Sequence, residues 1–327
     1  MWRIGLAVVL GVVLTAAWLQ GNESGSGVAR VGFLATGSLS TPKSAYVFRV
    51  FRDSLSGLGY VEGQNLVIEY RGAAGRFADL PRLATELIRL KTDVVVATGS
   101  ASIRAVKAAM TAAPIVAIDL ESDPVASGFV ASLAHPGGNL TGVFLDHSAL
   151  SGKWLQLLKD VFPKLDRAAV LWDPAHLSPQ LEAIKTAAGA MAIELQPIAV
   201  QDAADLEKAF ETARRGRAQA VVVLSAPPFS NESPRLARVA FTSRLPTIAP
   251  FREFVVAGGM MAYGPDEDAN YRRLASMVDK ILRGGRPSDI PVERPTRFNL
   301  LVNVKTAKAL GLTIPQSILV RADEIIQ

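Results

Sequence analysis

The sequence of 327 residues contains no cysteine and only three histidines, His135, His147 and His176. Without cysteine the chain cannot form disulfides, cysteine-ligated zinc sites, iron–sulfur clusters or a catalytic thiol. It also lacks the cysteine to which a lipoprotein anchor would be attached. Three histidines do not favour a histidine-rich metal site, and we expect no metal site in this protein.

Motifs for nucleotide binding and catalysis are missing as well. Gly25-Ser26-Gly27 precedes the first predicted strand, whereas the glycine-rich loop of a dinucleotide site follows one. The chain has no Walker A loop, no G-x-S-x-G elbow and no H-E-x-x-H helix. His135 stands in His-Pro-Gly-Gly-Asn, which is typical of a turn and favours a structural role. We therefore expect a protein that is not an enzyme and needs no cofactor.

The composition is that of a globular protein, with 49% hydrophobic and 20% charged residues. Its length allows two domains or one large domain. The net charge of +5, from 35 basic and 30 acidic residues, is spread along the chain. No helix-turn-helix pattern precedes the first predicted strand, so neither charge nor motif indicates a nucleic acid partner.

The first 27 residues are typical of an export signal. Arg3 gives a positive start, residues 4–19 carry no charge, and a polar stretch follows. The uncharged run is short for a permanent membrane anchor, which needs roughly 20 apolar residues. Its small-x-small site, Thr15-Ala16-Ala17, leaves both cleavage and retention as a tether open. The sequence thus predicts an extracytoplasmic, periplasmic protein with a signal peptide or N-terminal anchor at residues 1–27.

From residue 28 onward, short apolar runs alternate with helical patterns, which is the signature of an α/β fold. The order of elements repeats in the second half, and 27 residues separate Ile68 from Val95 and Leu195 from Val222. Runs such as VVVAT and VVVLS are apolar throughout and predict strands buried on both faces of parallel sheets. Strands are predicted at 30–36, 65–71, 93–99, 114–120, 139–144, 167–173, 193–200, 220–225, 246–251, 260–264 and 299–304, and helices at 42–58, 79–90, 101–111, 178–190, 205–214, 234–243 and 266–282.

The repeated order predicts two Rossmann-like lobes with a cleft between them. We expect the first lobe at residues 28–142 plus 264–296 and the second at 143–263 plus 297–327, with the late elements crossing back between them. In doubly wound sheets, ligands bind at the carboxyl ends of the strands, where helix N-termini gather. Candidate site residues are therefore expected at those ends.

Hydroxyl groups follow two strands of the predicted first lobe. Thr36 and Ser38 come after the first strand, and Thr98, Gly99 and Ser100 come after the third. Hydroxyls and free N–H groups at a helix start bind a carboxylate or another anion. The alternative is that Ser38 and Ser100 only cap helices, since serine is a common N-cap.

Carboxylates follow the fourth strand, at Asp119, Glu121 and Asp123. Three carboxylates within five residues favour a cation such as an ammonium group. Alternatively, the segment is a turn in which Asp123 caps the backbone after Pro124. Of the three, we predict only Asp123 as a ligand contact.

Five further candidates come from the second half of the chain. Aromatic side chains at strand ends form either a stacking wall for a ligand or a cover for the sheet. Asp266 either contacts a ligand or caps the helix after it. Trp154 lies in a helical pattern and is assigned to the core. The five candidates are Trp172, Ser225, Phe251, Tyr263 and Asp266.

Four segments resemble the motifs of a known family. They are Leu55–Asn65, Asp123–Gly142, Tyr263–Asp266 and Asn303–Pro315. In this order they resemble the ABC-transporter substrate-binding proteins related to the tryptophan/tyrosine-type solute receptors, and the resemblance covers nearly all of residues 30–327. The chain departs from the family pattern at His135, where arginine is usual, and at Asp119 and Glu121, where apolar residues are usual.

The resemblance implies a type I periplasmic-binding fold, in which two lobes are joined by three crossover segments. It also implies a monomeric receptor that closes on a small polar solute and delivers it to the membrane permease of an ABC importer. An amino-acid-like solute, aromatic ones included, suits paired hydroxyl and carboxylate contacts. Two alternatives stay open, namely a solute-sensing module for a signalling partner and an enzyme on the same frame that uses Asp119, Glu121 and Asp123.

Overall fold

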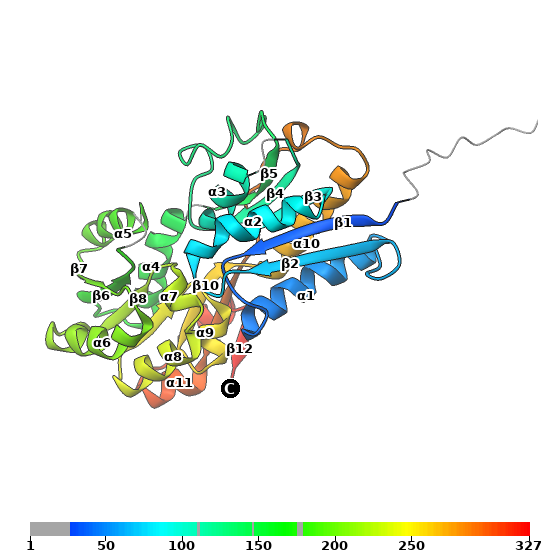
Figure 1. Ribbon diagram of the computed structural model, residues 1–327. Coiled ribbons are helices and arrows are strands. Elements are labelled where there is room, and N and C mark those ends of the chain that lie inside the picture. The colour runs from blue at the N-terminus through cyan, green and yellow to red at the C-terminus, as the bar shows by residue number, and fades with distance from the viewer. Residues whose placement is uncertain (1–26, 110–111, 146, 175–178) are drawn as a thin grey trace, which may run out of the picture.

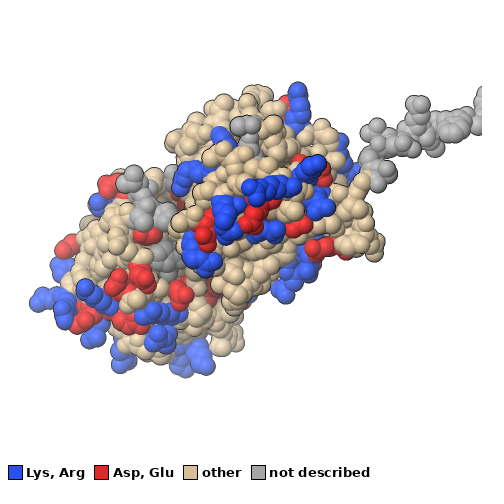
Figure 2. Space-filling view, in the orientation of Figure 1, with Lys and Arg blue, Asp and Glu red and all other residues tan. Residues whose placement is uncertain are grey.

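The computed structural model describes residues 27–109, 112–145, 147–174 and 179–327. Two lobes, each built on one sheet covered by helices, lie next to each other (Figure 1). Residues 1–26 of the predicted signal or anchor segment and His176 lie outside the described residues. Within the described ranges, no helix has the length and apolar character that crossing a membrane requires. Figure 2 shows basic and acidic side chains interspersed over the visible face of both lobes.

The first sheet contains five parallel strands in the order β2-β1-β3-β4-β5. Its central strands are buried because both of their faces carry apolar side chains. One face packs against helices α1 and α10, and the other packs against α2 and α3. The bounds are β1 Ala29–Ala35, α1 Pro42–Gly57, β2 Leu66–Gly72, α2 Leu80–Arg89, β3 Val94–Thr98, α3 Ser100–Ala109, β4 Ile115–Asp119, β5 Leu140–Phe144 and α10 Glu267–Leu282.

The second sheet contains seven strands in the order β12-β11-β10-β9-β8-β6-β7. Among the described strands, one pair departs from the expected parallel arrangement, because β10 and β11 run antiparallel with Pro265 opposite Phe298. The reason is the path of the chain, since β10 leads out to the first lobe and β11 returns from it at the same end. The bounds are β6 Arg167–Trp172, β7 Glu194–Ala199, β8 Ala220–Val223, β9 Thr247–Ala249, β10 Met261–Pro265, β11 Phe298–Asn303 and β12 Glu324–Ile326.

Helices also cover both faces of the second sheet. Trp154 of α4 is fully buried in the core on one face, as predicted. Phe210 of α6 and Phe254 of α9 fill the core on the other face. The bounds are α4 Ser151–Val161, α5 Pro179–Ala190, α6 Leu206–Arg215, α7 Pro227–Ser230, α8 Ser233–Thr242, α9 Arg252–Val256, α11 Val304–Ala309 and α12 Gln316–Leu319, with short 3-10 turns η1 Phe77–Asp79, η2 His147–Leu150, η3 Ala203–Asp205 and η4 Pro287–Asp289.

The chain passes between the two sheets three times. It leaves the first sheet after β5, returns after β10, and leaves again before β11. Strand β5 ends at Phe144 in the first sheet and β10 begins at Met261 in the second, so both strands run across the predicted lobe boundaries at 142 and 264. The division into lobes stays a prediction, and these passages are the places where a hinge would act.

Candidate ligand-binding cleft

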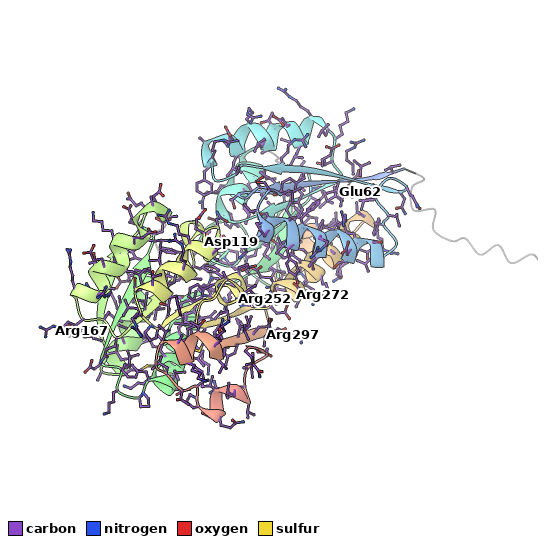
Figure 3. The ribbon with its side chains drawn as sticks, turned by 90° about the horizontal axis from the view of Figure 1, so that it is seen from below. Glu62, Asp119, Arg167, Arg252, Arg272 and Arg297 are labelled. Carbon is purple, nitrogen blue, oxygen red and sulfur yellow. The ribbon has the colours of Figure 1, made fainter. Side chains whose placement is uncertain are left out.

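A cleft of about 560 Å³ lies between the two lobes. Its walls come from the carboxyl ends of β1, β3 and β4 in the first lobe and from the segments that follow β8 and β9 in the second. This volume is in the range of small-molecule sites, roughly 300–1,000 Å³. Figure 3 shows Asp119 where the lobes meet, and Arg252 and Arg272 line the same cleft.

Seven of the predicted site residues line this cleft. The register of the first sheet explains part of the group, since Ala35 of β1 lies beside Thr98 of β3 and the residues after both strands therefore emerge together. The backbone turns sharply there, with a φ of +79° at Gly99, a conformation that favours glycine. The seven are Thr36, Thr98, Gly99, Ser100, Ser225, Phe251 and Asp266.

Asp266 lines the cleft and also caps a helix, which is the alternative role that the sequence predicts for it. Its Oδ1 accepts a hydrogen bond of 2.9 Å from the backbone N–H of Ala269 and so caps α10. Arg297 lies 3.8 Å from its Oδ2. Two of its interactions are thus structural, and any contact with a ligand would be additional to them.

Ser38 and Asp123 lie outside the cleft lining. The side chain of Thr41, not that of Ser38, caps α1, while Ser38 Oγ accepts from the backbone N–H of Ser40 at 3.2 Å. Asp123 Oδ1 accepts from the backbone N–H groups of Val125 and Ala126 at 2.8 and 2.9 Å. This is the turn given as the alternative for Asp123, and the second carboxylate oxygen, Oδ2, lies 3.7 Å from Arg294 instead of facing the cleft.

Trp172 and Tyr263 also lie outside the lining, on the core side of the second lobe. Both pack partly buried against the apolar cluster that contains Trp154. The ring of Tyr263 stacks on Phe298 with centroids 6.0 Å apart, and its carbonyl accepts from Trp154 Nε1 at 2.8 Å. Aromatic residues at these strand ends cover the sheet because their large apolar area is removed from water there.

The carboxylates after β4 reach the cleft at Asp119 and Glu121 instead of at Asp123. Asp119 is only 2% exposed, and its Oδ1 accepts from the backbone N–H of Glu121 at 3.0 Å. Glu121 Oε1 accepts from the hydroxyl of Ser225 at 2.9 Å, so this contact joins the lobes across the cleft. The sequence predicts a cation-binding group among the three carboxylates after this strand, but it favours Asp123 as the ligand contact, whereas Asp119 and Glu121 line the cleft.

Lys43 is a cleft residue that sequence reasoning missed. Its Nζ lies 2.8 Å from Glu267 Oε1, 3.8 Å from Glu253 Oε2 and 5.2 Å from the centroid of Phe251. Burial lowers the pKa of Lys43, but the carboxylates of Glu267 and Glu253 raise it by more, so the ammonium group stays protonated. No sequence signal distinguishes this lysine, because its partners come from two distant helices.

His147 is a second missed residue. Its side chain is 2% exposed, it lines the cleft, and neither ring nitrogen has a hydrogen-bond partner among the described residues. Its ring lies 6.2 Å from that of Trp154. Burial, helped by the positive charge of Lys43, lowers the pKa of His147 to about 3. The imidazole is therefore neutral at physiological pH.

Aromatic rings complete the lining at Tyr46, Phe77, Phe251 and Tyr271. Tyr46 is 36% exposed and donates its hydroxyl hydrogen to Asp268 Oδ2 at 2.9 Å. Among the described residues, no group of histidines and carboxylates is arranged to hold a metal ion. The cleft thus combines anion-binding hydroxyls, carboxylates, one half-buried ammonium group and aromatic walls.

A family model described as ABC transporter substrate binding protein matches residues 38–326. The tyrosine-binding protein of Clostridioides difficile (strain R20291) is 24% identical over 264 residues, which are 80% of this chain and 75% of that protein. Two solved structures share the fold. A conserved domain protein of Vibrio cholerae has a TM-score of 0.83 at 24% identity, and an ABC domain of Streptococcus pneumoniae in complex with L-Trp has a TM-score of 0.82 at 23% identity. Each comparison covers 91% of this chain and 99% of the other.

Proposed function

The chain belongs to the family of ABC transporter substrate-binding proteins, and on this premise we propose that it captures an amino-acid-like solute, aromatic ones included, outside the cytoplasm. The bound solute is delivered to the permease of an importer. The family is not enzymatic, and its fold is the type I periplasmic-binding fold. The observation that carries the finer proposal is the cleft between the lobes, where groups for both ends of a zwitterion stand beside aromatic rings.

The carboxylate of the solute binds at the start of α3. Thr98 and Ser100 offer hydroxyls there, and the first N–H groups of this ten-residue helix point toward the cleft end of the sheet. A helix N-terminus carries a partial positive charge and unpaired donors, which together favour an anion. The ammonium group binds at Asp119 and Glu121, whose carboxylates supply the opposite charge.

The side chain of the solute lies against the aromatic rings. Phe77 and Phe251 come from opposite lobes, and both line the cleft. An aromatic solute placed between them gains buried apolar area and favourable ring contacts. Two relatives support this choice of solute, since one is named a tyrosine-binding protein and the other was solved with L-Trp.

Closure couples binding to delivery. A solute that contacts both lobes stabilises only the closed arrangement, so binding shifts the hinge equilibrium. A shift from 1% to 99% closed needs about 5.5 kcal/mol of differential affinity, which charge-assisted hydrogen bonds and a buried ring can supply. The closed form presents surfaces of both lobes together to the permease.

The test is a thermal-shift screen of amino acids, nucleobases, sugars and small acids, followed by titration calorimetry of the compounds that bind. The double substitution Thr98→Val with Ser100→Ala is expected to weaken amino acid binding at least 30-fold. Asp123→Asn is the matched control, because Asp123 lies outside the lining, and we expect it to stay within about threefold of the wild type. Stabilisation by sugars or nucleobases but by no amino acid would overturn the proposed solute class.

A further inference from the structure

Two polar side chains in the cleft have buried atoms that lack hydrogen-bond partners, although the Glu253 side chain as a whole is 26% exposed. Both ring nitrogens of His147 and the Oε2 atom of Glu253 lack one among the described residues. Both residues line the cleft. They come from separate parts of the chain, since His147 lies in the turn η2 after the first passage between the lobes and Glu253 lies in α9.

Both groups interact with the same ammonium group, that of Lys43. Lys43 lies 3.8 Å from Glu253 Oε2, and its positive charge also acts on His147. The ammonium group of Lys43 lies closer to Glu267, at 2.8 Å, than to Glu253, at 3.8 Å. It therefore offsets the negative charge of Glu253 less completely than that of Glu267. The imidazole is neutral and so carries one donor and one acceptor.

An unpartnered buried polar group costs about 1–3 kcal/mol, so buried polar groups are nearly always paired in folded proteins. Two such groups in the wall of one ligand cleft are explained if the ligand supplies the partners. We propose that His147 and Glu253 form a subsite that hydrogen-bonds an N–H or O–H group on the side chain of the solute. This inference rests on the proposed function and narrows its substrate class to amino acids with a polar group on the side chain.

Selectivity follows from the chemistry of the subsite. The hydroxyl of L-tyrosine or the indole N–H of L-tryptophan satisfies one of the two groups, whereas L-phenylalanine leaves both unpaired. A site built to hydrogen-bond a substrate group rejects the analogue that lacks it far more strongly than a hydrophobic pocket does. We therefore expect the protein to bind L-tyrosine or L-tryptophan at least tenfold more tightly than L-phenylalanine.

The experiment measures the affinities of these three amino acids by calorimetry for the wild type, His147→Phe and Glu253→Gln. His147→Phe keeps an aromatic ring and removes both nitrogens, so it is expected to bring the three affinities within about threefold of one another by weakening the polar ligands. Glu253→Gln is expected to reduce the preference at least threefold. His135→Phe is the matched control, because it removes an exposed histidine outside the cleft lining.

The ratio of affinities separates recognition from a structural role. A histidine that only supports the fold lowers all three affinities together, and a preserved ratio in both variants overturns the subsite. Equal binding of L-phenylalanine and the polar ligands by the wild type also overturns it, while the proposed function stands. Binding of no amino acid overturns the proposed function and the subsite with it. If His147→Phe does not fold, as judged by circular dichroism, Glu253→Gln alone decides.

Discussion

The hydroxyl of Ser225 in the second lobe donates to Glu121 Oε1 in the first lobe at 2.9 Å. Ser225 follows β8 and Glu121 follows β4, so the contact joins the carboxyl ends of the two sheets. Lys43 makes a second link, because its ammonium group lies over the ring of Phe251 from the other lobe. These contacts exist only while the lobes are close together, so they contribute to the stability of that arrangement.

Ser225→Ala is expected to weaken solute binding about tenfold, because a hydrogen bond to a charged group is lost from the closed form and the closed population falls. Calorimetry with the best-binding amino acid checks the affinity, and solution scattering of the free protein should show a larger radius of gyration. Ser225→Thr keeps the hydroxyl and serves as the control. Wild-type affinity in the alanine variant would show that this bond does not bias closure.

Lys43→Met is expected to lower the free energy of unfolding by about 2 kcal/mol. The lysine side chain is 23% exposed, and its removal leaves two acidic neighbours without their cation. Urea denaturation gives the difference. The control is Arg286→Met, which removes an exposed ion pair with Asp289 and is expected to change stability by less than about 0.5 kcal/mol. Equal losses in the free energy of unfolding would contradict the expectation that the partly buried ion pairs of Lys43 stabilise the fold more than the exposed ion pair of Arg286.

The fold and part of the cleft could be predicted because both depend on local patterns. Runs that are apolar at every position identified the central strands. Thr98 is the last residue of one such strand and Ser100 comes two residues later, so their place in the cleft could be predicted from the strand alone. The parallel register then places residues after neighbouring strands together. Asp123 shows the limit of this reasoning, since a carboxylate after a strand serves its own turn equally well.

The rest of the cleft depends on packing between distant segments. Lys43 meets Glu267 because α1 packs on α10, and this contact cannot be read from either helix alone. A lysine in the first turn of an amphipathic helix is usually exposed, so the sequence of α1 alone gives no indication that Lys43 is partly buried. His147 follows β5 at a passage between the lobes, where the sequence has neither helical nor strand periodicity. Its burial comes from packing against α4 and α5, with the ring of Trp154 6.2 Å from its own.

Gly264→Ala is expected to destabilise the protein by about 2 kcal/mol or more and to weaken binding. A Cβ atom at this position would lie 2.1 Å from the carbonyl oxygen of Pro250, which precedes Phe251 in the cleft. Thermal and urea unfolding measure the loss. Gly189→Ala in α5 is the control, because its Cβ would meet open space and alanine stabilises a helix by up to about 1 kcal/mol. If Gly264→Ala left the free energy of unfolding unchanged, the backbone around Pro250 and Gly264 would have to shift at little cost to make room for the methyl group.

The buried imidazole of His147 predicts a specific pH dependence of stability. Its pKa is about 3 in the folded protein and lies at the ordinary value of 6.5 in the unfolded chain. Between these values the unfolded chain binds a proton that the folded protein does not bind, so stability falls as the pH drops below about 6.5. Between pH 7 and pH 5 the wild type is expected to lose about 2 kcal/mol more than His147→Phe. Urea unfolding at both pH values tests this, with His135→Phe as the control for losing an exposed histidine. A gap between wild type and His147→Phe that does not change with pH would show that the imidazole becomes protonated without unfolding, and hence that water reaches it in the closed cleft.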